Sequence, residues 1–309
     1  FGSSNLEISS VAVGTWAMGG ENSAGGSFGE VDRNESIAAI KTMLDGGVNI
    51  IDTAPIYGEG AAEEIVGEAI KGYDRSKIFI ATKFGSYISH NKYDATLKEV
   101  EESLERLGTD YIDFYLMHWP DVNTSIEETM AALNYLKKNG KIRFIGLCNS
   151  SKELIEEALK FGEVNVIQPP FSMVNQSQKE LMEWAEANGI ATMTSGSLGA
   201  GILTGTIREL PNFDEKDFRL TFYPFFKEPT FSKIMELLET LDKVAQKYDK
   251  PVAQVAINWS TQKSFVNTAL LGVRNAKEAK INCETFQWQL EEEDIKCIDD
   301  EILRLEIGN

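Results

Sequence analysis

The sequence predicts an α/β protein, a single-domain (β/α)8 TIM barrel with an enlarged loop after the seventh strand. Two patterns in the 309 residues carry this prediction. Short, nearly continuous apolar runs rich in β-branched residues recur along the chain, as is typical of parallel strands covered on both faces. Segments with a helical spacing of apolar residues separate these runs. No Pro/Ser-rich linker interrupts the alternation, so we expect residues 1–309 to form one domain.

The apolar runs define eight expected strands, which are Val11–Trp16, Val48–Asp52, Ile78–Lys83, Tyr111–His118, Ile142–Leu147, Val164–Gln168, Ile190–Thr194 and Phe265–Gly272. The helices between them have recognisable ends. Asp32 and Ser125 are expected helix caps, each with a glutamate three residues later, and Gly108 and Pro251 are expected to end one helix and begin another. This order of elements is that of a barrel with one helix after each strand.

One connection is much longer than the others. It runs from Thr194 to Phe265 and contains an aromatic-rich stretch from Phe218 to Phe226. Long loops at the carboxyl end of barrel strands usually shape a binding site, so we expect this loop to face the substrate. The alternative architecture, a doubly wound sheet, would require a G-x-G-x-x-G turn after an early strand, and no glycine cluster here has that order and place.

The charge balance excludes several classes of partner. The chain has 30 Lys and Arg residues against 48 Asp and Glu residues, a formal net charge of −18. Such a protein lacks the basic face that binds nucleic acid, and an anionic membrane surface repels it. The three cysteines, Cys148, Cys283 and Cys297, are far apart, which argues against a disulfide framework and a metal site and favours a reducing cytoplasm.

Titratable residues lie at the ends of three successive expected strands. The second strand ends in Asp52, the third in Lys83 and the fourth in His118, and Tyr57 follows Asp52 in the next loop. Each residue alone has an ordinary structural explanation. In a barrel, however, the carboxyl ends of the strands meet at one face, so we expect these four side chains to converge.

These residue types together suit a proton transfer to a carbonyl oxygen. A free tyrosine, with a pKa of about 10, is a poor proton donor near neutrality. An adjacent ammonium lowers the pKa of the phenol, a carboxylate keeps the ammonium charged, and an imidazole can hydrogen-bond the carbonyl. No side chain can supply a hydride, so reduction of the carbonyl requires a cofactor.

The sequence resembles the aldo-keto reductases over nearly the whole chain, and within them the bacterial reductases of sugars, polyols and small aldehydes. The resemblance rests on motifs in family order, among them VGTWAMGG, IDTAPIYG, ATKFG, SLERLGTDYIDFYLMHWPD, IRFIGLCNSS, VIQPPFS, GSLGAGILTG and LLGVRNAKEAKIN. It implies NAD(P)H-dependent reduction of an aldehyde or ketone to an alcohol. By the same resemblance the catalytic residues are Asp52, Tyr57, Lys83 and His118, with Tyr57 as the proton donor.

The resemblance also implies the binding residues. For the substrate these are Trp16, Tyr57, His118 and Trp119. For the cofactor they are Thr15, Trp16, Asp52, Asn149, Gln168, Ser195, Gly196, Ser197, Leu198, Gly201, Gly272, Val273, Arg274, Glu278 and Asn282. Asn149 and Gln168 match the pair that binds the nicotinamide carboxamide, and the segment from Gly272 matches the adenosine end.

Three positions depart from the family pattern. Ser195 replaces a tyrosine that stacks on the nicotinamide, Cys148 stands where serine is common, and Glu278 stands where Arg or Gln is often found near the 2′-phosphate. A carboxylate there opposes NADP(H), whereas Arg274 favours it. We expect NADP(H) to be favoured and NAD(H) to be possible.

Two other functions remain open at this point. A regulatory or binding subunit with slow turnover is favoured by Ser195 and opposed by the intact catalytic residues. A Schiff-base aldolase would use Lys83 as its nucleophile, but it leaves Tyr57 and His118 unexplained.

Overall fold

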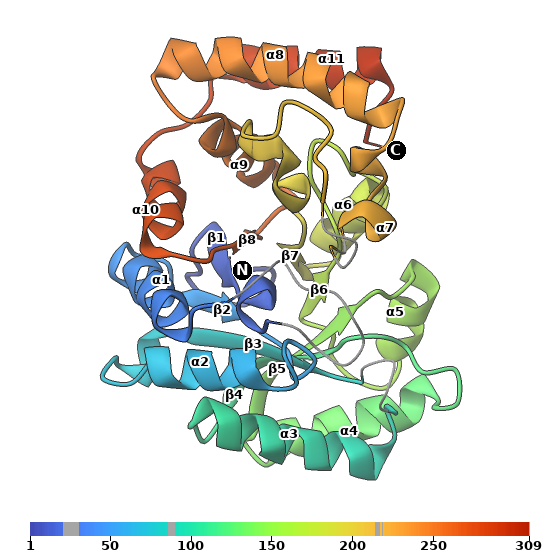
Figure 1. Cartoon of the computed structure of the whole chain (residues 1–309). Coiled ribbons are helices and arrows are strands. Elements are labelled where there is room, and N and C mark those ends of the chain that lie inside the picture. The colour runs from blue at the N-terminus through green and yellow to red at the C-terminus, as the bar shows by residue number, and fades with distance from the viewer. Residues whose placement is uncertain (21–30, 86–89, 214–216, 218, 309) are drawn as a thin grey trace.

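The computed structural model describes residues 1–20, 31–85, 90–213, 217 and 219–308. Eight parallel strands close into a barrel in which each strand pairs with the next and β8 pairs with β1 (Figure 1). The strands are β1 Val11–Gly14, β2 Ile50–Asp52, β3 Phe79–Phe84, β4 Ile112–Met117, β5 Ile142–Cys148, β6 Val166–Gln168, β7 Ala191–Thr194 and β8 Thr268–Gly272. The predicted barrel and all its predicted strands are thereby confirmed.

Helices surround the barrel on its outside (Figure 1). The α-helices are α1 Arg33–Asp45, α2 Ala61–Ala69, α3 Tyr93–Leu107, α4 Ile126–Lys138, α5 Lys152–Ala158, α6 Lys179–Ala187, α7 Arg219–Phe222, α8 Thr230–Tyr248, α9 Val252–Thr261, α10 Ala276–Glu284 and α11 Glu292–Leu305. Short 3₁₀ turns are η1 Trp16–Met18, η2 Arg75–Lys77, η3 Gly199–Thr204, η4 Pro224–Phe226 and η5 Thr285–Gln287. No helix among these described residues is long and apolar enough to cross a membrane.

The strand boundaries differ from the sequence-based expectation by up to three residues. Asp32 and Ser125 cap α1 and α4 through their side chains, and Gly108 ends α3 in a left-handed conformation, as predicted. The first expected strand is too long, because β1 ends at Gly14 and Trp16 begins η1. Pro251 caps α9 instead of being its first residue.

The enlarged loop after β7 is confirmed and builds much of a second hydrophobic core. It carries η3, α7, η4, α8 and α9, and α8 lies beside α11 along one edge of the molecule (Figure 1). Phe225 and Phe226, from the aromatic-rich stretch, are buried in this second core. Their position indicates packing, so the expected substrate-facing role does not extend to them; Phe218 lies outside the described residues.

The amino-terminal end of the barrel is closed by the start of the chain. Phe1, Leu6 and Ile8 pack against the residues that fill the barrel interior, and the Phe1 ring lies 5.3 Å from that of Phe114. The opposite end, where the strands finish, is therefore the end at which side chains can reach a ligand.

A contact between two glycines fixes the loop that follows β2. Gly58 has a φ of 62°, and a Cβ atom built there would overlap the carbonyl oxygen of Gly19. A Cβ at Gly19 would in turn overlap the backbone of Tyr57. Because only glycine allows this approach, the loop after η1 holds the backbone of Tyr57 in place.

We predict that Gly58→Ala destabilises the fold by about 3 kcal/mol or more, since the methyl group adds a clash to the cost of a left-handed alanine. The matched control is Gly140→Ala, because Gly140 has a φ of 73° and no atom within 4 Å of an added Cβ. We expect that control to lose only about 1 kcal/mol. Urea unfolding measures both losses, and equal losses would contradict the importance of the Gly19 contact.

Candidate active site

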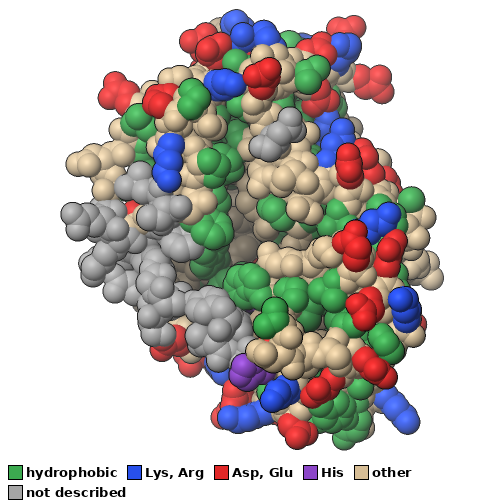
Figure 2. All heavy atoms as spheres, turned by 90° about the vertical axis from the view of Figure 1, so that its right-hand side faces the viewer, with side chains coloured by type: hydrophobic (Ala, Val, Ile, Leu, Met, Phe, Trp, Pro, Cys, Tyr) green, Lys and Arg blue, Asp and Glu red, His purple; other side chains and the backbone are tan. Residues whose placement is uncertain are grey.

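The alternation of side chains along the strands places the candidate residues. Ile50, Ala81 and Leu116 lie in the cluster that fills the barrel interior. Side chains two positions apart on a strand share a face, so Asp52 and Lys83 also point inward, one layer closer to the carboxyl ends. His118 directly follows β4 at the same level. Figure 2 views this end of the molecule, and the surface is hollowed near its middle, with charged side chains mostly farther out.

Lys83 is the centre of the polar cluster inside the barrel. Its side chain is fully buried, and its Nζ donates to both carboxylate oxygens of Asp52 at 2.8 Å and to the carbonyl oxygen of Thr53 at 2.9 Å. Its Nζ lies 3.4 Å from the hydroxyl oxygen of Tyr57. The structure thus brings together three of the four predicted catalytic residues through one ammonium group.

The protonation of this cluster follows from burial and from the ion pair. Burial is the largest single influence and acts to lower the pKa of Lys83, but Asp52, with smaller contributions from Tyr57 and Cys148, outweighs it and the pKa is raised. Lys83 is therefore held as an ammonium, which opposes its use as a Schiff-base nucleophile.

The expectation for Tyr57 needs a correction. Burial raises its pKa to about 12, although Lys83 acts to lower it as expected. Desolvation of the phenolate inside the barrel outweighs the attraction of the ammonium. Tyr57 therefore keeps its proton at every physiological pH. The Lys83 ammonium offsets only part of the free-energy cost of ionising the buried phenol.

Two aromatic side chains flank the ring of Tyr57. The ring of His118 meets that of Tyr57 edge-on at 6.1 Å, and Trp119 stacks on His118 at 3.7 Å. Trp16 lies 6.3 Å from the Tyr57 ring and is 37% exposed. Burial, and then the Lys83 ammonium, holds the pKa of His118 well below its usual value, so its imidazole is neutral near pH 7. The four predicted substrate residues therefore form one wall.

Three predicted cofactor residues are bonded directly to the candidate catalytic residues. Gln168 donates from Nε2 to Oδ2 of Asp52 at 2.7 Å, and a carboxylate can only accept, which fixes the direction of this amide. Asn149 donates from Nδ2 to the carbonyl oxygen of His118 at 2.8 Å. Thr15 donates its hydroxyl to the carbonyl oxygen of Asp52 at 3.0 Å. Sequence reasoning missed the bond between Gln168 and Asp52, since their separation in the chain gives no signal of it.

The residues predicted for the rest of the dinucleotide leave space for it. A Cβ atom built at Gly196, Gly201 or Gly272 would meet no atom within 4 Å, so each backbone borders open space. The Nδ2 atom of Asn282 is buried and has no hydrogen-bond partner among the described residues. An elongated ligand with its own acceptor fits this arrangement.

The other predicted residues on this path differ in what they can offer. Ser195 follows β7 two positions after Met193, which points into the barrel, so its side chain is expected on the same inward face. The Ser197 hydroxyl donates to the carbonyl oxygen of Thr194 at 3.3 Å. Leu198 packs between the two hydrophobic cores. Val273 is fully buried as a whole residue, so it supports the path by packing.

The two residues that were expected to act against each other form a pair. Glu278 accepts from the backbone nitrogen of Arg274 at 2.9 Å and from its guanidinium at 3.2 Å. Both lie at the start of α10, where Asn275 caps the helix. The carboxylate thus offsets the guanidinium charge at the position that the sequence predicts for the adenosine end of the cofactor.

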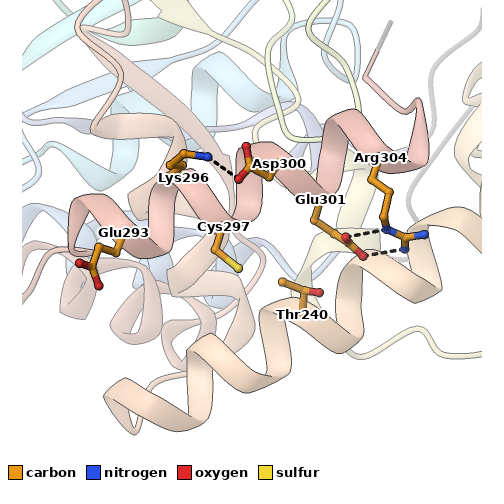
Figure 3. A pocket seen from close by; sticks show the side chains of 7 residues that line it. All are labelled: Thr240, Glu293, Lys296, Cys297, Asp300, Glu301 and Arg304. Atoms are coloured by element: carbon orange, nitrogen blue, oxygen red, sulfur yellow. Dashed lines mark hydrogen bonds and ion pairs between the residues drawn. The ribbon is translucent and has the colours of Figure 1, made fainter.

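A separate surface pocket lies between α8 and α11 (Figure 3). It has a volume of about 440 Å³ and is lined by Thr240, Glu293, Lys296, Cys297, Asp300, Glu301 and Arg304. Lys296 is paired with Asp300, and Arg304 with Glu301. None of the predicted site residues lines this pocket, and its cations are already neutralised.

The depressed pKa of His118 gives a prediction for stability. The unfolded chain takes up a proton on this histidine below pH 6.5 while the folded protein does not, so stability is lost as the pH falls. Between pH 7.5 and 5.5 the wild type should lose about 1 kcal/mol more than His118→Asn. Urea unfolding at both pH values measures this difference.

The chain has only two histidines, which supplies the control for that measurement. His90 lies on the surface beside Asp121. His90→Asn should keep the wild-type pH dependence, and a His118→Asn variant that also kept it would contradict a buried neutral imidazole.

Comparison with known proteins agrees with this geometry. The family model "Aldo/keto reductase family" matches residues 10–302. The chain is 37% identical over 302 residues to aldo-keto reductase YhdN of Bacillus subtilis, covering 95% of this chain and 89% of that protein. It is 32% identical over 314 residues to the NADH-specific methylglyoxal reductase of Escherichia coli, covering 95% and 94%.

Solved structures give the same result. The glycerol dehydrogenase AKR11B4 of Gluconobacter oxydans superimposes with a TM-score of 0.88 at 33% identity, covering 99% of this chain and 94% of that one. An aldo/keto reductase of Klebsiella pneumoniae in complex with NADP and acetate has a TM-score of 0.75 at 25% identity, covering 95% and 91%. The chain therefore belongs to the aldo/keto reductase family of NAD(P)-dependent oxidoreductases, which reduce carbonyl compounds.

Proposed function

We propose that this protein reduces a small aldehyde or ketone with Tyr57 as the proton donor. The observation that carries the proposal is the 3.4 Å separation between the Lys83 Nζ and the Tyr57 hydroxyl. The ion pair with Asp52 keeps Lys83 in its charged form at this position. As the carbonyl carbon accepts a hydride, its oxygen becomes an alkoxide and takes the phenolic proton of Tyr57. The ammonium beside the phenol stabilises the phenolate that remains until water returns the proton.

His118 orients the carbonyl in this proposal. Its imidazole is neutral, so it can donate one N–H to the carbonyl oxygen without competing as an acid. The adjacent rings of Trp16 and Trp119 form an apolar wall that excludes water from the reacting carbonyl. The substrate thus meets two hydrogen-bond donors, Tyr57 and His118, on one side.

The cofactor is a nicotinamide dinucleotide, and when bound in reduced form it supplies the hydride that no side chain can give. In our proposal Asn149 and Gln168 hold the carboxamide through their amide oxygens, because one N–H of each amide is already donated within the protein and fixes how the group is turned. Thr15 and Asp52 lie on the ribose side. The glycines at 196, 201 and 272 allow the pyrophosphate to approach the backbone.

At the adenosine end we propose that Asn282 binds the base and Arg274 the 2′-phosphate, so that NADP(H) is favoured. The pairing of Glu278 with Arg274 weakens this preference, and NAD(H) also binds. The Escherichia coli relative is NADH-specific by name, which agrees with a variable preference among related chains.

The proposed substrates are sugar, polyol-derived or other short carbonyl compounds. Relatives are named for methylglyoxal and glycerol, both small and polar. We further propose that residues 1–309 act as one domain, that the protein works in the cytoplasm, and that it binds no nucleic acid, in keeping with a net charge of −18.

We predict that Tyr57→Phe lowers kcat by about 1,000-fold while the dissociation constant of the cofactor changes by less than about twofold, because the hydroxyl acts in the transition state. Steady-state kinetics and fluorescence titration measure the two quantities. Tyr135→Phe, at an exposed tyrosine on α4, serves as the control and should behave as the wild type. Comparable turnover by Tyr57→Phe would rule out its role as the acid.

We predict that Glu278→Gln increases the ratio of NADPH affinity to NADH affinity by about fivefold, because the loss of one carboxylate frees Arg274 for the 2′-phosphate. Dissociation constants of both dinucleotides give this ratio directly. Glu284→Gln, at the other end of α10, is the matched control and should leave the ratio unchanged. A ratio that stays constant in Glu278→Gln would show that this carboxylate does not act on the phosphate site.

A further inference from the structure

A buried ion pair lies outside the barrel wall, between α2 and α3, which run side by side (Figure 1). Glu63 on α2 is fully buried, and its Oε2 accepts from Nε of Arg106 on α3 at 2.6 Å. The function proposed above assigns no task to this pair. Burying a carboxylate costs free energy unless it is well paired. A role beyond stability therefore has to be considered for Glu63, which lies next to the strand that carries Lys83.

The Glu63–Arg106 pair is hydrogen-bonded to β3, the strand that carries Lys83. The hydroxyl of Thr82 donates to Oε1 of Glu63 at 2.6 Å, so both carboxylate oxygens are occupied. Thr82 and Lys83 are neighbours on β3 and point to opposite faces of the barrel wall. The outward side chain is thereby locked to α2 and α3 at the position next to the inward ammonium.

The same pair also packs closely against the segment that follows Tyr57. Gly60, three residues after Tyr57, precedes α2 with a φ of 97°, and a Cβ built there would lie 2.6 Å from Cδ of Arg106. A Cβ at Gly67 would lie 2.6 Å from the carbonyl oxygen of Arg106. Arg106 therefore lies along α2 from Gly67 to Gly60 and leaves its first residues little freedom.

We propose that Glu63 and Arg106 are positioning residues that set the distance between the Tyr57 hydroxyl and the Lys83 ammonium. Glu63 is bonded to Thr82 on β3, next to Lys83. Arg106 packs against Gly60 at the start of α2, three residues after Tyr57. The two catalytic atoms come from different elements, and the pair joins those elements on the outside of the barrel. This inference rests on the proposed function, since it explains how that function keeps its geometry.

The separation being held is sensitive to small movements. At 3.4 Å the contact between Lys83 and Tyr57 is already longer than an ideal hydrogen bond, and a further shift would remove it. The Lys83–Asp52 bonds do not fix Tyr57, because Asp52 lies on β2 before the loop begins. The Gly19–Gly58 contact holds the Tyr57 backbone from one side, and rigid support from outside the barrel adds a constraint that links this segment to β3.

A similar buried network elsewhere provides a matched control. Asp113 on β4 is fully buried and pairs with Arg75 and Arg143, each at 2.7 Å. It also accepts from the backbone nitrogen of Ile80 on β3, three residues before Lys83. Asp113→Asn therefore disturbs a buried carboxylate bound to arginine and β3, but no part of the Tyr57 segment.

The test compares Glu63→Gln with Asp113→Asn, using methylglyoxal and the dinucleotide that binds more tightly, at a temperature where both variants are folded. The measured quantities are kcat, KM and the primary deuterium isotope effect on kcat with dinucleotide deuterated at nicotinamide C4. We expect Glu63→Gln to lower kcat about tenfold, with a larger isotope effect and little change in KM, because the chemical step slows. Asp113→Asn should leave kcat per folded molecule and the isotope effect at wild-type values.

A milder pair of variants keeps the test valid if Glu63→Gln fails to fold. Thr82→Val removes only the hydroxyl and should lower kcat with a raised isotope effect, whereas Thr82→Ser restores the hydroxyl and should restore both. Equal kinetics in Thr82→Val and Thr82→Ser, or equal changes in Glu63→Gln and Asp113→Asn, would overturn the inference while the wild type remains active. A wild type that reduces neither methylglyoxal nor a panel of other small carbonyls would instead overturn the proposed function, and the inference with it.

Discussion

The structure depends on keeping one ammonium group charged inside a barrel whose deeper layer is apolar. An unpaired ammonium there would cost several kcal/mol, so Lys83 must find its partners from other elements. Asp52 on β2 supplies the carboxylate and Thr53 a carbonyl oxygen, while Gln168 on β6 donates to the carboxylate from across the barrel. These partners meet only when the barrel is closed. The folded barrel and the charged cluster are therefore mutually dependent.

The same cluster determines where protons reside. Burial raises the pKa values of Tyr57 and Cys148 to about 12, and burial together with the nearby ammonium keeps His118 neutral. Near neutral pH the charges of Lys83 and Asp52 offset each other, and Tyr57 keeps its proton beside them. A site of this kind suits an uncharged carbonyl group, whose oxygen becomes basic only as the reaction proceeds. Cys148, a departure from the family pattern, adds a protonated thiol and no charge.

The strands, and the position of the candidate residues at their ends, could be predicted because both follow from local patterns. A continuous apolar run that ends in Asp52 or Lys83 predicts a buried strand and its position at the barrel mouth. The sign of the Tyr57 pKa shift could not be predicted, because it depends on the degree of burial. The support behind Tyr57 and Lys83 also escaped prediction, since Gly19 with Gly58 and Glu63 with Arg106 meet only through the fold. A glycine in a familiar motif indicates that another part of the chain packs closely against it, but the sequence does not show which part.

The central claim is that Tyr57 and His118 converge on one carbonyl oxygen beside the Lys83 ammonium. A crystal structure of the ternary complex with oxidised dinucleotide and an unreactive carboxylate analogue of the substrate tests this most directly. We expect one oxygen of the analogue to lie within about 3 Å of both the Tyr57 hydroxyl and an imidazole nitrogen of His118, with Lys83 still bonded to Asp52. An analogue bound elsewhere, or a Tyr57 side chain turned away from Lys83 in the complex, would contradict this account.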